Sequence, residues 1–203
     1  MGAGLLLLSV GRLTTRKGLR EFVERALPHI AAVHPSVKLV IVGDTPAQAL
    51  HAQAQSPASI QAAADAAGVG RCLKFLGVIT DYAELGVVYR ACDVHVFPVR
   101  EIPGDPEGFG MVAVEAAAHG LPTVAFSTGG VVDAVGNGIS GRLVAEGDYH
   151  VFADAIISLL GKQRCGRSAC IDFARGFEWS RFGERLRALL WLENMDMRCV
   201  QRD

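Results

Sequence analysis

Two glutamates and a glycine-rich turn lie close together in the second half of this sequence. The segment reads Glu107-Gly108-Phe109-Gly110-Met111-Val112-Ala113-Val114-Glu115. It follows the apolar run Val94–Phe97, which is typical of a buried strand, and its second half has the pattern of a helix. Glycines let the backbone come close to a ligand, and the free N–H groups at the start of a helix bind negatively charged oxygens. The segment therefore predicts a cradle for a diphosphate.

The two carboxylates indicate that the ligand also carries hydroxyl groups. Helical side chains lean toward the helix N-terminus, so Glu115 can reach back to the mouth that Glu107 flanks from the loop. Beside phosphates, carboxylates repel the ligand unless they accept hydrogen bonds from hydroxyl groups. A nucleotide sugar, with phosphates in its middle and hydroxyl-rich rings at either end, meets this requirement. Taken alone, such a glutamate can also be only a partner of the helix dipole, and a single glycine-rich turn is a weak signal.

Two cations follow the first predicted strand. Arg12 stands in Gly11-Arg12-Leu13, and Lys17 stands before Gly18 at the start of the first predicted helix. Arginine offers phosphate a planar fork and lysine a point charge, so the pair could neutralise a leaving diphosphate without magnesium. No Asp-x-Asp occurs in the sequence, which agrees with cationic side chains in the electrostatic role of a metal. The alternative is that both cations are ordinary solvated surface charges.

The elements that must position these residues are short apolar runs that alternate with helical patterns. Strands are predicted at Leu5–Val10, Val37–Val42, Leu73–Leu76, Val94–Phe97, Thr123–Phe126 and Arg142–Val144. Helices are predicted at Leu19–Val33, Ser59–Ala67, Tyr82–Ala91, Val112–His119, Val131–Val135 and Tyr149–Leu160. This alternation predicts an α/β fold with a doubly wound, mostly parallel Rossmann-like sheet. In such sheets ligands bind outside the carboxyl ends of the strands, where Gly11, Gly43 and Gly77 stand.

The remaining segments lie outside the predicted strands. The Ala- and Gln-rich segment Gln48–Ala67 is predicted to be a loop or a helical insertion, and the chain after Leu160 is predicted to be helical. Leu186, Leu189 and Leu190 form one apolar stripe on the terminal helix. Asp105, in Pro103-Gly104-Asp105-Pro106, is interpreted as a turn residue.

Composition excludes several classes of function. Lys+Arg 20 against Asp+Glu 21 gives a formal charge of -1, so no global basic field favours nucleic acid. The five cysteines are odd in number and widely spaced, which fits reduced thiols in a cytoplasmic protein. No metal-ligand spacing occurs among His29, His34, His51, His95 and His150, so no metal site is predicted. No apolar run approaches the roughly 20 residues that span a bilayer, so any membrane role would be peripheral, at the inner face.

The order of the motifs resembles that of the group 1, or family 4, glycosyltransferases. The shared pieces are Gly11-Arg12 with Lys17-Gly18, Phe75-Leu76-Gly77, Ala91-Cys92-Asp93-Val94, Phe97-Pro98, Glu107-Gly108-Phe109-Gly110 with Glu115-Ala116, Gly120-Leu121-Pro122-Thr123-Val124, Gly129-Gly130, and Asn137-Gly138-x-x-Gly141. Seven residues separate Glu107 from Glu115, as in the paired-glutamate signature of that family. The resemblance runs from about Leu5 to Leu160, and the chain looks like the family's C-terminal, donor-binding domain.

That resemblance implies a fold and a reaction. The fold would be one half of the two-domain GT-B architecture, in which an N-terminal domain or subunit holds the acceptor. The chain would divide into a nucleotide-sugar-binding domain, residues 1–175, and a crossing helix and tail, residues 176–203. Transfer would retain the anomeric configuration, and the nucleoside-diphosphate sugar would be a substrate, with no cofactor.

The resemblance also implies a role for each site residue. Arg12, Lys17 and Glu107 would be catalytic, the two cations at the diphosphate and the glutamate at the sugar hydroxyls. Glu115 would hold the ribose. The other donor-binding residues would be Gly11, Gly77, Val78, Gly108, Phe109, Gly110, Met111 and Val112, of which Gly77 and Val78 border the base and Met111 and Val112 offer main-chain N–H groups to phosphate.

Three other functions remain open at this stage. An epimerase or phosphorylase can share the architecture, and a non-catalytic module that binds a nucleotide sugar or a partner would need no acceptor half. A dinucleotide oxidoreductase is disfavoured, because Gly-x-Gly-x-x-Gly does not follow the first strand. The apolar terminal helix also allows a homodimer.

Overall fold

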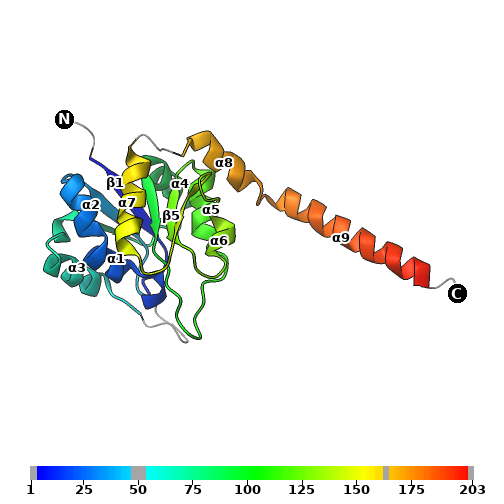
Figure 1. Ribbon diagram of the computed structural model, residues 1–203, viewed down its shortest axis with the longest axis horizontal. Coiled ribbons are helices and arrows are strands. Elements are labelled where there is room, and N and C mark those ends of the chain that lie inside the picture. Colours follow the sequence, from blue (N-terminus) through cyan, green and yellow to red (C-terminus); the bar gives the residue numbers. More distant parts are fainter. Residues whose placement is uncertain (1–3, 47–53, 162–164, 201–203) are drawn as a thin grey trace.

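The computed structural model describes residues 4–46, 54–161 and 165–200, with side chains up to residue 190. Six strands form one sheet in the order β3-β2-β1-β4-β5-β6 (Figure 1). They are β1 (Leu6–Val10), β2 (Lys38–Val42), β3 (Leu73–Gly77), β4 (Val94–Phe97), β5 (Thr123–Phe126) and β6 (Gly141–Val144). Every neighbouring pair is parallel, so the predicted doubly wound α/β sheet is confirmed.

The sheet has its topological switch point between β1 and β4. From β1 the chain moves outward to β2 and β3, and it then returns to the other side of β1 with β4. Leu7 of β1 pairs with Leu39 on one side and with Val94 on the other. A crevice opens where the two winding directions diverge, outside the carboxyl ends of β1 and β4. The segments after these two strands therefore lie at the expected place for a ligand.

Helices cover both faces of the sheet because neighbouring strand residues point to opposite sides. Leu7 packs in a core with α1 (Leu19–Arg25), α2 (Leu27–Val33), α3 (Pro57–Ala66) and α7 (Tyr149–Leu160). Leu8 packs on the other face with α4 (Tyr82–Ala91) and α5 (Met111–Ala118). The short α6 (Val131–Ala134) and α8 (Arg167–Arg175) pack on α5. All residues of β4 and β5 are buried, as strands covered on both faces require.

The single helix predicted over Leu19–Val33 is wrong. The structure has two helices, α1 and α2, that meet at Ala26. Pro28 stands in the first turn of α2, where its missing N–H costs nothing, but the same proline inside one long helix would lose a hydrogen bond and clash with the preceding turn. Pro28 therefore marks the start of a second helix rather than the middle of one.

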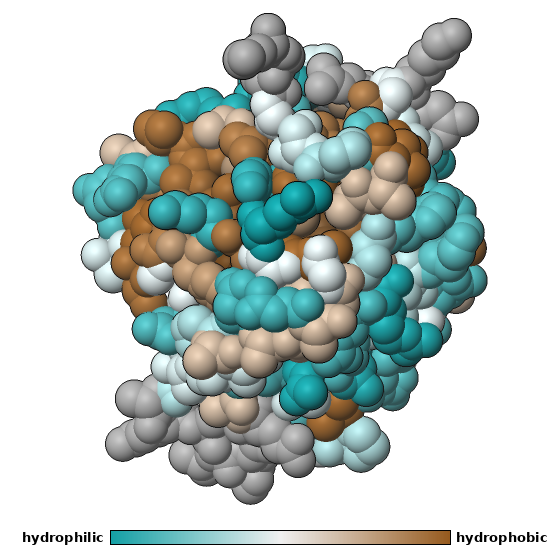
Figure 2. Space-filling model, turned by 90° about the vertical axis from the view of Figure 1, so that its left-hand side faces the viewer, coloured by the Kyte–Doolittle hydropathy of each residue, from teal (hydrophilic) through white to brown (hydrophobic). Residues whose placement is uncertain are grey.

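The C-terminal part is helical, as predicted. After α8, the helix α9 (Trp179–Val200) projects away from the rest of the molecule (Figure 1). Trp179 is 84% exposed and Leu189 is 60% exposed, although both are large and apolar. More than half of the surface of each of these two side chains is therefore open to solvent. Figure 2 shows the opposite end of the molecule, where apolar residues gather in patches that hydrophilic side chains interrupt.

The segment predicted to be a loop or a helical insertion contains a helix. The Ala- and Gln-rich segment Gln48–Ala67 contains α3, which Ser56 caps through a hydrogen bond from the backbone N–H of Ser59, while residues 47–53 lie outside the described part. Among the described helices, none combines the length and the apolar character that crossing a bilayer requires.

Candidate functional site

The segment after β1 is folded tightly against the segment after β4. It forms a 3-10 helix, η1 (Thr15–Lys17), which ends at Gly18 with a φ of 65°. A Cβ at position 18 would lie 2.0 Å from the carbonyl oxygen of Pro98, so only glycine permits this approach. Gly18 thereby fixes η1, with Lys17 at its end, on the β4 side of the switch-point crevice.

Lys17 and Arg16 hold one carboxylate between them. The Nζ of Lys17 donates to Oε2 of Glu107 at 2.8 Å, and the guanidinium of Arg16 donates to the same oxygen. The Nε of Arg16 also lies 3.2 Å from Oδ1 of Asp105. Arg16 is 7% exposed and Glu107 11%, so solvent screens this cluster weakly. The loop after β4 is therefore anchored to η1 by charge as well as by backbone contact.

The ammonium group of Lys17 is also enclosed by apolar neighbours. Its Nζ lies over the ring of Phe97, 4.8 Å from the ring centroid, and a Cβ at Gly11 would lie 3.6 Å from its Cε. Burial lowers the pKa of Lys17, while the hydrogen bond from Lys17 to Glu107 and the charge of Glu107 oppose that shift. The lysine is thus a charge held in one place at low local dielectric, where it would act strongly on an anion.

Arg12 lies on the open side of the same crevice. It is exposed, and no described residue forms an ion pair with it. It borders a hollow of about 310 Å³ at the carboxyl ends of β1 and β2. The hollow is lined by Val10, Gly11, Arg12, Val42, Gly43, Asp44, Thr45, Pro46, Val78, Ile79 and Leu85. Gly77, with a φ of 72°, turns the chain immediately before the 65%-exposed side chain of Val78.

The glycine-rich turn ends at the start of α5. Gly110 is the N-cap residue with a φ of 83°, and no side chain caps the helix there. A Cβ at Gly110 would lie 2.9 Å from the ring of Phe97, and one at Gly130 would lie 1.8 Å from the carbonyl oxygen of Gly108. Close packing on both sides fixes the turn, while Met111 at the helix start is 61% exposed. The first N–H groups of α5 are therefore available to an anion.

Glu115 belongs to a different hydrogen-bond network from Glu107. Its Oε2 accepts a hydrogen bond from the hydroxyl of Tyr89 at 3.1 Å. Tyr89 comes from α4, is 1% exposed, and stacks on the ring of His119 with a centroid distance of 5.3 Å. Burial and the neighbouring Glu115 raise the pKa of Tyr89, so the phenol stays protonated and donates. Tyr89 thus fixes the orientation of the Glu115 carboxylate.

A neutral histidine lies under the crevice. His95 of β4 is fully buried, and its Nδ1 lies 3.1 Å from the hydroxyl of Thr123. Burial, with a smaller contribution from the charge of Lys17, lowers the pKa of His95 to about 3. Its ring stacks with that of Phe97 at a centroid distance of 5.6 Å. His95 therefore supports the Phe97 ring without adding a charge below Lys17.

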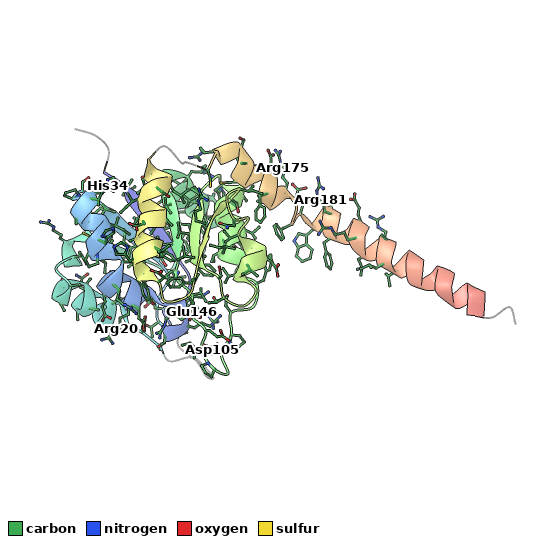
Figure 3. All side chains as sticks on the ribbon, in the orientation of Figure 1. Arg20, His34, Asp105, Glu146, Arg175 and Arg181 are labelled. Atoms are coloured by element: carbon green, nitrogen blue, oxygen red, sulfur yellow. The ribbon has the colours of Figure 1, made fainter. Side chains whose placement is uncertain are left out.

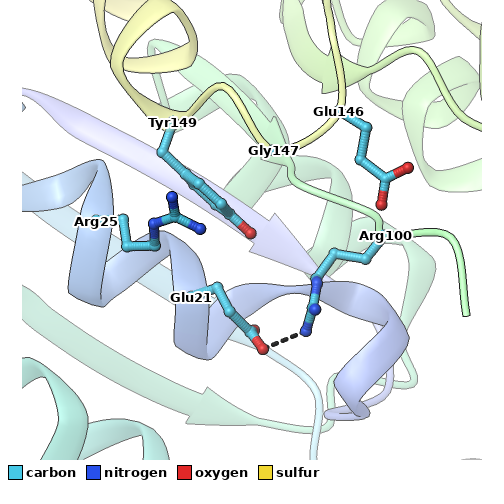
Figure 4. Close-up of a pocket in the computed structure, with 6 residues that line it drawn as sticks. All are labelled: Glu21, Arg25, Arg100, Glu146, Gly147 and Tyr149. Atoms are coloured by element: carbon cyan, nitrogen blue, oxygen red, sulfur yellow. Dashed lines mark hydrogen bonds and ion pairs between the residues drawn. The ribbon is translucent and has the colours of Figure 1, made fainter.

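A second hollow of about 270 Å³ lies beside η1 (Figure 4). It is lined by Glu21, Arg25, Arg100, Glu146, Gly147 and Tyr149. Arg100 pairs with Glu21, and the guanidinium of Arg25 stacks on the Tyr149 ring at 4.4 Å from the centroid. Both arginines thus have partners inside the hollow, so we assign it no ligand. The backbone N–H of Arg100 donates to the carbonyl oxygen of Arg16, which supports η1 from this side.

The family of the chain follows from sequence comparison. Residues 4–162 match the family "Glycosyl transferases group 1". The chain belongs to this family. The predicted resemblance is therefore confirmed. Two of its motifs, those that contain Lys17 and Glu107, meet at the β1/β4 switch point.

Relatives of the family fall into several sugar-transfer classes. D-inositol 3-phosphate glycosyltransferase of Mycobacteroides abscessus is 34% identical over 169 residues, which is 83% of this chain and 36% of that protein. Glycogen synthase of Mycobacterium tuberculosis is 34% identical over 178 residues, or 85% of this chain and 39% of that protein. The chain thus spans little more than a third of the length of these relatives.

Solved structures give the same fold. Sucrose-phosphate synthase of Thermosynechococcus elongatus, at 28% identity and a TM-score of 0.71, is matched over 93% of this chain and 46% of that one. Anabaena Alr3699/HepE in complex with UDP has a TM-score of 0.71 at 24% identity. It is matched over 92% of this chain and 48% of that one. The C-terminal domain of a group 1 protein of Francisella tularensis is matched over 85% of both chains, with a TM-score of 0.68 at 23% identity.

For this group 1 chain, the structure gathers most of the predicted site and adds residues to it. Lys17, Glu107 and the turn from Gly108 to Gly110 meet at the crevice, whereas Arg12 and Val78 border the adjoining hollow. Figure 3 places Asp105 at the same end of the domain as Glu146, far from Arg181 of α9.

Arg16 and Tyr89 were not predicted as site residues, and Asp105 was predicted only as a turn residue. One indirect signal was available in the sequence. Asp105 and Glu107 flank Pro106, and two neighbouring carboxylates are more than Lys17 alone can neutralise.

Proposed function

We propose that this chain is the donor-binding half of a retaining glycosyltransferase of GT-B architecture, and that it binds a nucleoside-diphosphate sugar without a metal ion. The observation that carries the proposal is the convergence of a half-buried lysine, an exposed arginine and the open start of α5 at the β1/β4 switch point. These groups supply positive potential from two side chains and from the helix N-terminus.

In this proposal each group has a separate task. Lys17 and the first N–H groups of α5 hold the phosphate next to the sugar, where negative charge grows as the glycosidic bond breaks. Arg12 holds the other phosphate from the open side. Glu107 uses Oε2 for Arg16 and Lys17, and no described residue hydrogen-bonds its Oε1, which we assign to a sugar hydroxyl. Leaving-group stabilisation of this kind acts on the transition state more than on the bound donor.

The hollow beside Arg12 is assigned to the nucleoside. Val78 and the carboxyl ends of β1 and β2 give it an apolar wall suited to a base. Glu115, oriented by Tyr89, is assigned to the ribose hydroxyls. The complexes of Anabaena Alr3699/HepE with UDP and with UDP-glucose support a uridine nucleotide as the first ligand to test.

The acceptor is assigned to a second domain or subunit. Relatives are longer than this chain, and in the proposed division residues 1–175 form the donor domain while residues 176–203 cross to the partner. The exposed apolar side chains of α9, such as Trp179 and Leu189, would then be covered by that partner. Reaction in the closed cleft would proceed through an oxocarbenium-like transition state, with attack on the face from which the diphosphate leaves. We place the enzyme in the cytoplasm, at most peripheral to the inner face of a membrane.

A non-catalytic nucleotide-sugar-binding module is the second candidate, and the same site would serve it. Calorimetry with UDP, GDP and ADP, each with and without EDTA, tests the shared part of both proposals. We expect binding of at least one nucleotide to persist in EDTA, and loss of that binding on chelation would refute the metal-free site. Sugar transfer from a UDP- or GDP-sugar by the chain joined to its acceptor half, with product stereochemistry determined by NMR, then separates the enzyme from the module.

A further inference from the structure

Three potential metal ligands meet on the outer surface of the α2–α7 pair. The Nε2 of His29 lies 3.0 Å from Oδ1 of Asp154, and the Nδ1 of His150 lies 3.2 Å from Oδ2 of the same carboxylate. All three donor atoms lie within 4.8 Å of one another. The side chains are 36%, 72% and 53% exposed in the order His29, His150 and Asp154, so an ion can reach them from solvent. None of the three belongs to the donor crevice.

The core fixes the positions of these three residues. His150 and Asp154 are four residues apart on α7 and therefore project from one face of that helix. Ile30 of α2 and Phe152 of α7 are buried in the same core cluster, which brings His29 beside them. The sequence interpretation found no metal-ligand spacing among the histidines. The cluster was not predicted because His29 and Asp154 are 125 positions apart in the sequence, and only His150-x-x-x-Asp154 is visible as a local signal.

The donor set and its spacing suit a particular class of ion. Zinc binds imidazole nitrogen and carboxylate oxygen at about 2.0–2.2 Å, so neighbouring ligand atoms in a tetrahedral site are about 3.3 Å apart. The two imidazole nitrogens lie close to this spacing from the carboxylate, His29 at 3.0 Å from Oδ1 and His150 at 3.2 Å from Oδ2 of Asp154. The nitrogens of the two imidazoles lie within 4.8 Å of each other, and rotation of the exposed His150 ring can adjust that spacing. Magnesium and calcium prefer oxygen ligands, whereas imidazole favours zinc and the neighbouring first-row metals.

We propose that His29, His150 and Asp154 form a surface site for Zn²⁺ or a similar first-row transition metal ion, with its remaining coordination position open to water. The ion would link α2 to α7 and would bind only the folded chain. It would therefore stabilise the fold by mass action, without taking part at the diphosphate site. The carboxylate of Asp154 is hydrogen-bonded to His29 and lies within ion-pair distance of His150, which keeps the three donors assembled.

The test is calorimetric titration of the tag-free chain with ZnCl₂, with the melting temperature measured with and without the ion. We expect one equivalent to bind and the melting temperature to rise. His29→Ala, His150→Ala and Asp154→Asn should each weaken binding by at least about tenfold and abolish the rise. His34→Ala is the matched control, because His34 ends the same helix as His29 but lies outside the cluster, and it should bind zinc as the unaltered chain does.

Cysteine is the competing ligand, so the coordinating atoms need their own readout. Cys72, Cys92 and Cys170 are buried, and Cys165 is half-buried. With Co²⁺ in place of zinc, we expect a visible spectrum without thiolate-to-metal charge transfer. A chain that binds no zinc, variants that bind it as tightly as the unaltered chain, or a Co²⁺ spectrum dominated by thiolate would each overturn the site. None of these results depends on nucleotide binding, so the proposed function stands or falls separately.

Discussion

Replacement of Arg16 by methionine tests the idea that a buried arginine holds the loop after β4 in place. Arg16 contacts the carboxylates of Glu107 and Asp105 and is 7% exposed. Methionine keeps much of the apolar stem but removes every hydrogen-bond donor of the guanidinium. Glu107 retains Lys17 as a partner, whereas Asp105 loses the ion-pair partner that Arg16 provides.

The expected cost follows from these remaining contacts. Removal of one partner from a fully buried ion pair costs about 3–5 kcal/mol, since a charge is left without compensation. Here Lys17 still compensates Glu107, and Asp105 is 21% exposed, so we expect a loss of about 2–3 kcal/mol in the free energy of unfolding. For a chain of this size that corresponds to a fall of about 4–12 °C in Tm.

Urea unfolding provides the measurement, with stability compared at a constant m-value. Arg20→Met is the matched control, because Arg20 forms an exposed pair with Glu24 in which the two side chains are 53% and 37% exposed. Such a pair contributes about 0.3–0.5 kcal/mol. If the two variants lose the same stability, the Arg16 cluster does not anchor the loop and the reasoning is refuted.

Three further substitutions address the crevice. Lys17→Met should weaken binding of a nucleoside diphosphate about 10- to 150-fold by calorimetry, the effect of about 1.5–3 kcal/mol for a hydrogen bond to a charged group, while Lys38→Met on the exposed end of β2 should not. Equal affinities would remove Lys17 from the diphosphate site. Tyr89→Phe deprives Glu115 of its donor and should weaken binding of a nucleoside diphosphate but not of pyrophosphate; a parallel loss for both would contradict the ribose assignment. His95 has a folded-state pKa of about 3, below its unfolded value of 6.5, so the unfolded chain binds the extra proton between these values and stability falls as pH falls through this window. His95→Phe should reduce that fall by up to about 1.4 kcal/mol per pH unit in urea titrations, and an unchanged pH profile would show that His95 is protonated in the folded state.

The sheet was predictable because its strands are buried on both faces. Such strands read as unbroken apolar runs, and the predicted ranges Val94–Phe97 and Thr123–Phe126 agree with β4 and β5. The break between α1 and α2 was not predicted, since the apolar spacing continues across it and only Pro28 marks the change. Periodicity reports which face of a segment is apolar, whereas the end of a helix depends on single backbone groups.

The site likewise has a part that was predictable and a part that was not. Glycines and cations at strand ends predicted the place of Lys17 and of the turn before α5, because parallel topology brings strand ends together. The partners of those residues were hidden. Arg16 and Glu107 are 91 residues apart, Tyr89 reaches Glu115 from another helix, and neither pairing has a local pattern. Contacts of this kind are set by how helices and loops pack, so only the structure shows them.

The shared carboxylate explains why the crevice carries three cations. Glu107 neutralises part of the charge of Lys17. In the proposed donor complex, Arg12 would be the first cation that an arriving diphosphate meets, since no described residue forms an ion pair with it. If Lys17 donated its hydrogen bonds to phosphate instead, Glu107 would lose a neutralising partner, and its negative charge would repel the donor. Arg16 prevents this, because it keeps its own contact with Oε2 from the buried side. In the proposed donor complex, Arg16 therefore lets one oxygen of Glu107 stay ionised and in place while the other accepts a sugar hydroxyl.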